Sequence, residues 1–246
     1  MNGVLVSAVS AAPSADDFRA LARSSPWRFT TVHFTHEGHR GADRGADGIV
    51  EAWLDRHADR VTVRSVRGIE TAEGTPYGGS GTDTAPLRRR DQPTLRPDGL
   101  VATRPHDWYI HHGDPMWRDY QWTAMLDPAE LSCGVQINDV TATTLRGRPT
   151  WSATCRPLIG DGEDWAGGYE PRCGCCPLMD SAASRLPEYG PDHASLRAVD
   201  LPTTYLVHLD VQTAIAVQIS ALDGWGGTVL RNDILTVDEP LDPPSR

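Results

Sequence analysis

The chain has 246 residues, of which 39% are hydrophobic, and this is enough for one large domain or two small ones with a buried core. Its 23 basic residues are all arginine, and the lack of lysine excludes a Schiff base, a P-loop lysine and a lysine general base. The formal net charge of -10, with Arg88-Arg89-Arg90 as the only cationic run, argues against a nucleic-acid partner.

The N-terminal segment and the cysteine count bear on the location of the protein. Residues 1–13 are mildly apolar but lack a positive n-region, and no run of about 18 apolar residues follows. We therefore expect a cytoplasmic protein without a transmembrane segment, with an exported protein as the alternative. Five cysteines is an odd number, so a secreted form would leave one thiol unpaired, whereas a reducing compartment would keep all five free.

The first part of the chain is predicted to form a helix followed by strands. Apolar side chains recur at helical spacing after Ser14, a residue type that caps helices, so a short helix is expected up to Ser24. From residue 27 to 34 the period changes to two, which predicts a strand. After a Gly- and Asp-rich turn, two more antiparallel strands are expected, over residues 49–55 and 60–66.

The middle of the chain combines a loop with an aromatic-rich insertion. Residues 72–97 contain Gly78-Gly79-Ser80-Gly81 and four prolines, which is typical of a long flexible loop. A short strand is expected over residues 100–103, followed by an aromatic stretch that leads into a helical segment. There Asp127 is predicted to cap a one-turn helix with Pro128 at its first position.

The second half of the chain is again predicted to be β, with residues 238–246 as a C-terminal tail. Strands are expected over residues 135–145, 148–158, 203–210, 214–220 and 228–237, the first two joined by a hairpin at Arg146-Gly147. Eight or nine strands in meander order predict a mainly β (α+β) fold, in one domain over residues 1–246. The strongly curved antiparallel sheet would form a half-open β-barrel, covered by the helix and the insertion around a cavity. Its open edges make a homodimer possible.

Six motifs carry a resemblance over most of the chain. They are Trp27-Arg28-Phe29-Thr30, Val50-Glu51-Ala52-Trp53-Leu54, Asp114-Pro115-Met116-Trp117, Tyr120-Gln121-Trp122-Thr123-Ala124-Met125-Leu126-Asp127-Pro128, Tyr169-Glu170-Pro171-Arg172-Cys173-Gly174-Cys175-Cys176-Pro177-Leu178 and Val237-Asp238-Glu239-Pro240. With them the chain resembles a group of bacterial proteins, mostly of unknown function. That group is similar to the lipoprotein-carrier superfamily (LolA, RseB and LppX types). The resemblance implies a half-open antiparallel barrel covered by helices, with acyl chains bound in an apolar cavity, and it supplies no catalytic residue.

Three of the five cysteines lie within four residues, at Cys173, Cys175 and Cys176. Zinc prefers four nitrogen or sulfur ligands, so the cluster lacks a local fourth ligand. Cys155 is one candidate, although its strand position is more typical of a small core residue, and Cys133 is a weaker one. Without a fourth ligand, the thiolates are suited to Cu(I).

Two other interpretations of the same cluster stay open. Cys173 and Cys176 are spaced as a redox pair, with Arg172 beside them to lower a thiol pKa, but the βαβ context of thioredoxin is missing. Alternatively, Pro171 and Pro177 bracket a tight turn whose thiols pack under the sheet or form a local disulfide. We favour this structural interpretation, a staple near the cavity.

A second cluster of polar side chains lies in the aromatic stretch. His111 or His112 is a candidate general base, with Asp107 or Asp114 to orient it, in what is expected to be the mouth of the cavity. A solvated surface loop is the alternative interpretation.

The aromatic side chains of the insertion are candidates for contacts with an apolar ligand. They are Trp108, Tyr109, Trp117, Tyr120 and Trp122. Some of them are expected to seal the core, while Trp117 and Trp122 are expected to face the cavity.

Three functions follow from these patterns. The first is the binding of a hydrophobic small molecule, lipid or acyl chain in the cavity of a carrier-like half-barrel. The alternative is a cofactor-independent cytoplasmic enzyme of the cyclase or isomerase type, which would use the His/Asp cluster in secondary metabolism. The third is a metal-binding protein with zinc or copper at the cysteine cluster.

Overall fold

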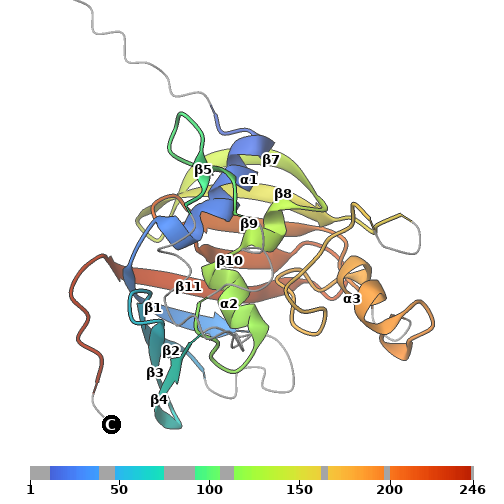
Figure 1. Ribbon diagram of the computed structural model, residues 1–246. Helices are drawn as coiled ribbons and strands as arrows, with labels where there is room; N and C mark the ends of the chain where they lie inside the picture. Colours follow the sequence, from blue (N-terminus) through green and yellow to red (C-terminus); the bar gives the residue numbers. More distant parts are fainter. Residues whose placement is uncertain are drawn as a thin grey trace, which may run out of the picture.

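The computed structural model describes residues 12–38, 48–74, 92–105, 114–161, 166–196 and 200–244. The main element of this part of the chain is one nine-stranded antiparallel sheet, whose strand order is β4-β3-β2-β1-β11-β10-β9-β8-β7 (Figure 1). The strands are β1 (Thr31–Gly38), β2 (Val50–Asp55), β3 (Arg60–Ser65), β4 (Gly68–Glu73), β7 (Val135–Leu145), β8 (Arg148–Pro157), β9 (Tyr205–Asp210), β10 (Ala216–Ala221) and β11 (Gly227–Val237).

Two meanders make up this sheet, and one long-range pairing joins them. The strands β1 to β4 follow one another at one end and β7 to β11 at the other, while β11 pairs with β1. In the described part of the chain the order ends at β4 and β7 without closing, so the predicted half-open form is confirmed. The homodimer expected from open edges stays a prediction, with β4 and β7 as the edges concerned.

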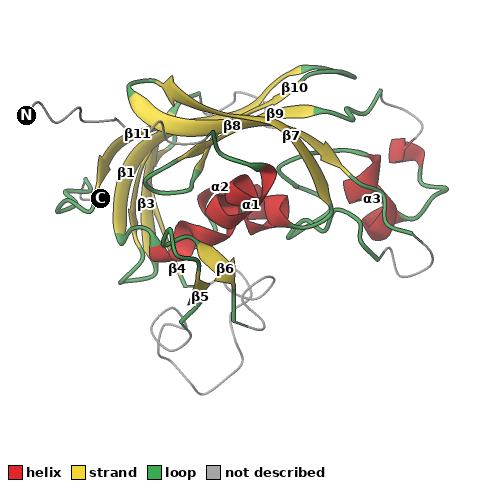
Figure 2. Ribbon diagram, turned by 90° about the horizontal axis from the view of Figure 1, so that it is seen from above, coloured by secondary structure: helices red, strands yellow, loops and turns green. Residues whose placement is uncertain are grey.

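The sheet bends around the helices that cover its inner face (Figure 2). Side chains alternate along each strand, so Tyr205, Val207 and Leu209 of β9 point to the same face, and all three are fully buried. They belong to one apolar core with Phe18 and Leu21 of α1 (Ala15–Ser24). Burial of a large apolar side chain contributes about 1.5–3 kcal/mol, so this core holds the cover, that is, the helices α1 and α2 (Tyr120–Leu126), on the sheet.

The N-terminal helix confirms the sequence prediction. Ser14 accepts a hydrogen bond from the backbone N–H of Asp17, whose carboxylate accepts from Ser14 in return, and the helix ends at Ser24. The strand expected from residue 27 begins later, at Thr31. Pro26 fixes a helical φ, so the chain continues as a 3₁₀ turn, η1 (Ser25–Trp27), before the strand starts.

The predicted helix cap at Asp127 is wrong. The helix of the insertion is α2 (Tyr120–Leu126), and its cap is Asp119, whose carboxylate accepts from the backbone N–H of Trp122. Asp127 follows the end of α2 and uses its carboxylate for buried ion pairs instead. The one-turn helix is η3 (Ala129–Ser132), which has no side-chain cap.

The long loop expected over residues 72–97 is shorter at both ends. Strand β4 continues to Glu73, and β5 (Thr94–Leu95) pairs with β6 (Val101–Thr103) in a separate small sheet. Backbone pairing with β3 and β6 orders these ends, although their side chains show little apolar alternation. Residues 75–91 lie outside the described residues.

Several elements were not predicted: the strands β4 and β5, the helix α3 (Ala182–Tyr189), and the 3₁₀ turns η1 and η4 (Ala194–Leu196). Ser181 caps α3 by accepting from the backbone N–H of Ser184, a signal that the sequence already carried. Pro187 inside the helix obscured it. None of the helices described here is long and apolar enough to span a membrane.

Candidate functional site

The side chains of Trp117 and Trp122 lie together between α2 and the inner face of the sheet. Their ring centroids are 4.9 Å apart, and only 7% and 2% of the two residues are exposed. Trp122 also contacts Phe34 and His36 of β1, at centroid distances of 5.5 and 5.2 Å. Trp117 donates from Nε1 to Glu70 at 3.0 Å. The structure therefore brings these two predicted ligand-binding residues together in the core.

The indole N–H of Trp122 is buried without a hydrogen bond. Within the described part of the chain, Nε1 of Trp122 has no acceptor. Such a buried, unpaired donor costs about 1–3 kcal/mol, so this is a position where an acceptor from outside the chain would be favourable. The third predicted aromatic residue in the described part, Tyr120, is half-buried at the start of α2.

The other members of the predicted histidine and aromatic cluster lie outside the described residues. They are Asp107, Trp108, Tyr109, His111 and His112. Their roles as acid–base or ligand-binding groups stay predictions.

Asp114 is described, and it forms a buried ion pair with Arg56. Its two carboxylate oxygens accept from Nε and Nη2 of Arg56 at 2.7 and 2.6 Å, and both side chains are almost completely buried. Arg56 also donates to the carbonyl of Leu126 at 3.0 Å and lies over the ring of Phe29. The pair therefore ties the end of α2 to the strand end after β2, a role that the sequence did not reveal.

A second buried ionic group surrounds Asp127. Its carboxylate contacts Arg104 and Arg172, the latter at 2.7 Å, and the three side chains are at most 6% exposed. Burial alone raises the pKa of Asp127, but the charges of Arg104 and Arg172 outweigh it and hold this pKa below its usual value. Asp127 thus stays ionised and joins the chain after β6, the end of α2 and the cysteine segment, residues 169–178.

Glu130 anchors the same segment from the other side. It accepts from the hydroxyl of Tyr169 and from the backbone N–H groups of Leu178, at 2.8 Å, and Arg172, at 3.3 Å. Burial raises the pKa of Glu130 above its ordinary value, and these hydrogen bonds offset only part of the effect. The two ends of the cysteine segment are therefore fixed to η3 through one carboxyl group.

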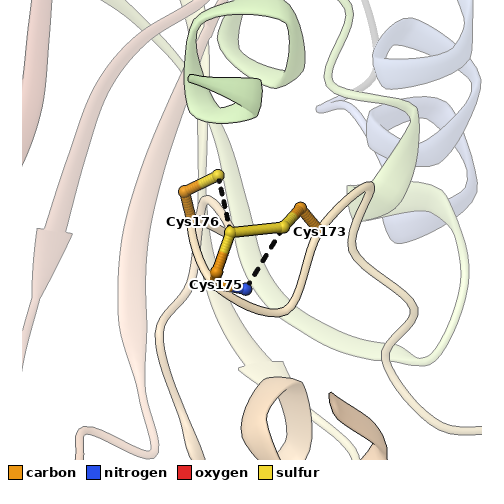
Figure 3. Close-up of side chains that lie close together, drawn as sticks. All are labelled: Cys173, Cys175 and Cys176. Carbon is orange, nitrogen blue, oxygen red and sulfur yellow. Dashed lines mark hydrogen bonds between the residues drawn. A yellow bond between two sulfur atoms is a disulfide. The ribbon is translucent and has the colours of Figure 1, made fainter. Parts of the chain in front are cut away.

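The three clustered cysteines lie in one loop, with α2 (green) on one side and α3 (orange) on the other (Figure 3). Cys173 and Cys175 form a disulfide, which is the local disulfide that the structural interpretation allowed, and Cys133, Cys155 and Cys176 are free. The pairing differs from the Cys173 and Cys176 pair of the redox interpretation. The tight turn at Gly174 brings the two outer thiols of the C-G-C sequence together. Sγ of Cys176 lies 3.5 Å from Sγ of Cys175, and all three sulfur atoms lie within 4.8 Å of one another.

The two candidates for a fourth metal ligand, Cys155 and Cys133, differ in their exposure. Cys155 is fully buried in the core, as its strand position predicts, and burial raises its pKa to about 12. Cys133 is exposed. Within the described residues the only metal-type cluster that includes these sulfur atoms consists of Cys173, Cys175 and Cys176.

The cysteine loop packs tightly against α3 and borders a cavity. A Cβ atom at Gly174 would lie 2.6 Å from Cβ of Glu188 and 2.9 Å from the carbonyl of Ser184, so only glycine fits there. The cavity beside it has a volume of about 320 Å³ and is lined by Cys133, residues 166–171 and Glu188, among others.

Comparisons with known proteins find similar folds only. No protein-family model matches the chain, and no curated protein matches its sequence. Among solved structures, MucB is 12% identical with a TM-score of 0.37; the match covers 94% of this chain and 60% of MucB. The MucA/MucB complex from Pseudomonas aeruginosa is 13% identical with a TM-score of 0.36; the match covers 89% of this chain and 55% of that chain.

The lipoprotein LppX from Mycobacterium tuberculosis is 13% identical with a TM-score of 0.39, over 94% of this chain and all of LppX. This chain spans 60% of the length of MucB. At these identities and TM-scores the likeness concerns the fold, and we draw no functional argument from it.

Proposed function

We propose that the protein binds an apolar small molecule or acyl chain between the inner face of the curved sheet and α2, and that Trp122 donates a hydrogen bond to the ligand. The observation that carries the proposal is the buried indole N–H of Trp122, which has no acceptor within the described residues. The ligand therefore needs an acceptor atom, such as a carboxylate or carbonyl oxygen, next to an apolar body.

The surroundings of Trp122 support an apolar ligand. The indole is bordered by Trp117 and by Phe34, and the core around it includes Met125 and Leu126 of α2. Aromatic faces of this kind contribute large apolar contact areas to a ligand.

The cover is also built of short pieces. The helices α1 and α2 have 10 and 7 residues, and the buried ion pairs at Asp114 and Asp127 both lie at the C-terminal end of α2. Short helices bury less apolar area on a sheet face than a second packed sheet would, so less free energy is needed to separate them from it. This arrangement is suited to admitting a ligand under α2.

The first test is to purify the protein without detergent and to analyse an organic extract by mass spectrometry. A bound lipid or other apolar compound is expected in amounts close to one per chain. The second test is to titrate the delipidated protein with a long-chain fatty acid and to follow tryptophan fluorescence.

Trp122→Phe removes the indole N–H and keeps an aromatic ring. A hydrogen bond to a charged acceptor is worth about 1.5–3 kcal/mol, so Trp122→Phe should weaken fatty-acid binding about tenfold or more. Trp53→Phe is the matched control, because Trp53 stacks on His33 at 4.8 Å and lies on the opposite sheet face from Phe34. An equal loss in both variants, or no binding by the wild type, would contradict the proposal.

A further inference from the structure

The cysteine loop brings three sulfur donors to one point on the protein surface. The Sγ atoms of Cys173, Cys175 and Cys176 lie within 4.8 Å of one another, while Cys175 is exposed and the other two are partly buried. Three sulfur atoms that bind one metal ion at about 2.3 Å are separated by distances of this order. The exposed side at Cys175 provides the path by which an ion enters.

Backbone N–H groups are directed at these sulfur atoms. The N–H of Cys175 donates to Sγ of Cys173 at 3.4 Å. The backbone N–H groups of Tyr120 and Gln121, at the start of α2, lie near Sγ of Cys176. Hydrogen bonds of this kind orient sulfur ligands and stabilise their negative charge.

The loop is held in this shape by contacts on both sides. Gly174 lies against α3 so closely that a Cβ atom would collide with Glu188. On the other side, the side chain of Gln121 donates to the carbonyl of Pro177 at 3.1 Å. Because the loop is fixed between α2 and α3, little conformational entropy is lost when its three sulfur atoms bind a common ion.

We propose that the reduced loop is a binding site for one Cu(I) ion, with Cys173, Cys175 and Cys176 as its three thiolate ligands, and that the Cys173–Cys175 disulfide is its metal-free, oxidised state. Soft thiolate ligands select Cu(I), which accepts low coordination, whereas zinc takes four ligands. In the described part of the chain no fourth donor joins the cluster, and this favours Cu(I). The site is separate from the proposed ligand position at Trp122.

Formation of the Cu(I) site takes two steps, reduction of the disulfide and binding of the metal ion. A phosphine reductant gives two electrons to the disulfide and takes the oxygen atom of one water molecule, while Cys173 and Cys175 each gain a proton. When Cu(I) binds, the three thiols release three protons and form three sulfur–copper bonds. Because binding releases protons, Cu(I) affinity should increase with pH.

The test uses the full chain, reduced with a phosphine and desalted without oxygen. Cu(I) is presented as its coloured bicinchoninate complex, and the loss of colour measures transfer to the protein. We expect the reduced chain to take one Cu(I) and the disulfide form to bind it at least about tenfold more weakly. Cys176→Ser should lose at least about tenfold in affinity, because removal of a ligand costs no less than removal of an outer partner.

Cys133→Ser is the matched control, because Cys133 is also an accessible thiol but lies outside the cluster. Its Cu(I) affinity should equal that of the wild type. A readout without variants is alkylation by iodoacetamide followed by peptide mass spectrometry. Bound Cu(I) should protect the peptide with Cys173, Cys175 and Cys176, while Cys133 is still modified.

Three results would overturn the proposal: bicinchoninate keeps all of the Cu(I), Cys133→Ser loses as much affinity as Cys176→Ser, or alkylation of the cluster is unchanged by Cu(I). Displacement of Cu(I) by an equal concentration of Zn(II) would overturn the choice of metal. None of these measurements depends on the lipid extract or on fatty-acid binding. The Cu(I) proposal and the proposed function can therefore be refuted separately.

Discussion

Replacement of Asp127 by asparagine tests whether the buried ionic group holds the cover on the sheet. Asp127 is 1% exposed and faces the guanidinium groups of Arg104 and Arg172, which are 6% and 4% exposed. Asparagine has nearly the same shape but no charge. The two arginines would therefore stay buried without a counter-ion, while the packing of α2 would change little.

The expected cost follows from this burial. Removal of one partner from a buried ion pair destabilises a protein by about 3–5 kcal/mol, because the remaining charge is desolvated and uncompensated. For a chain of this length, each 1 kcal/mol lowers the melting temperature by about 2–4 °C, so Asp127→Asn should lower it by roughly 6–20 °C. The measurement is urea or thermal unfolding followed by circular dichroism.

Asp233→Asn is the matched control. Asp233 also lies between two arginines, Arg146 and Arg231, but its side chain is 31% exposed and those of the arginines are 23% and 46% exposed. Exposed ion pairs contribute about 0–1 kcal/mol, so this variant should change stability little. If both variants cost the same, or if Asp127→Asn costs less than about 1 kcal/mol, the argument from burial is refuted.

The pH dependence provides a second check. The folded pKa of Asp127 lies below its ordinary value of 3.8. The contribution of this carboxylate to stability is therefore present above pH 3.8 and is lost as the pH falls through the folded pKa. The difference between wild type and Asp127→Asn should therefore narrow only in strong acid.

Two further predictions concern Glu130 and Gly134. The folded pKa of Glu130 lies above 4.5, so its contribution to the free energy of unfolding is full below that pH and falls as the pH rises through the folded pKa. This loss gives a slope of at most about 1.4 kcal/mol per pH unit. Glu130→Gln should remove the slope in urea unfolding between pH 4.5 and neutrality. An unchanged slope would contradict the raised pKa. A Cβ atom at Gly134, which has φ +59°, would lie 1.8 Å from the carbonyl of Gly168, so Gly134→Ala should cost about 2–5 kcal/mol of unfolding free energy from backbone strain and the clash together. Gly147→Ala shares the positive φ without a clash and should cost about 1–2 kcal/mol; equal costs would show that the clash is relieved.

The strands and the first helix were predictable because their signals are local. The expected strand over residues 135–145 matches β7, and the expected strand over residues 148–158 is one residue longer than β8. Ser14 was correctly identified as the cap of α1. Alternation and capping depend on neighbours within a few residues, so a single sequence carries them. Strand β4 was missed because none of its side chains is fully buried, and α3 because Pro187 masked its helical signal.

The candidate sites were predictable in part for the same reason. The sequence placed Cys173, Cys175 and Cys176 together and assigned Cys155 to the core. It named Trp117 and Trp122 as residues that face a cavity, which stays a prediction, but the contact of Trp122 with β1 depends on how α2 packs against the sheet.

The sequence by itself determined the periodicity of the strands, the cap of α1 and the presence of a three-cysteine loop. Only the tertiary structure decided the pairing of β1 with β11, the disulfide partner of Cys173 and the partners of the buried aspartates. Arg56 and Asp114 are 58 residues apart in the sequence, and Asp127 is 23 and 45 residues from its two arginines. Many arginines and carboxylates in this chain have the right charge, and the packing of the cover on the sheet selects which of them are brought together away from water.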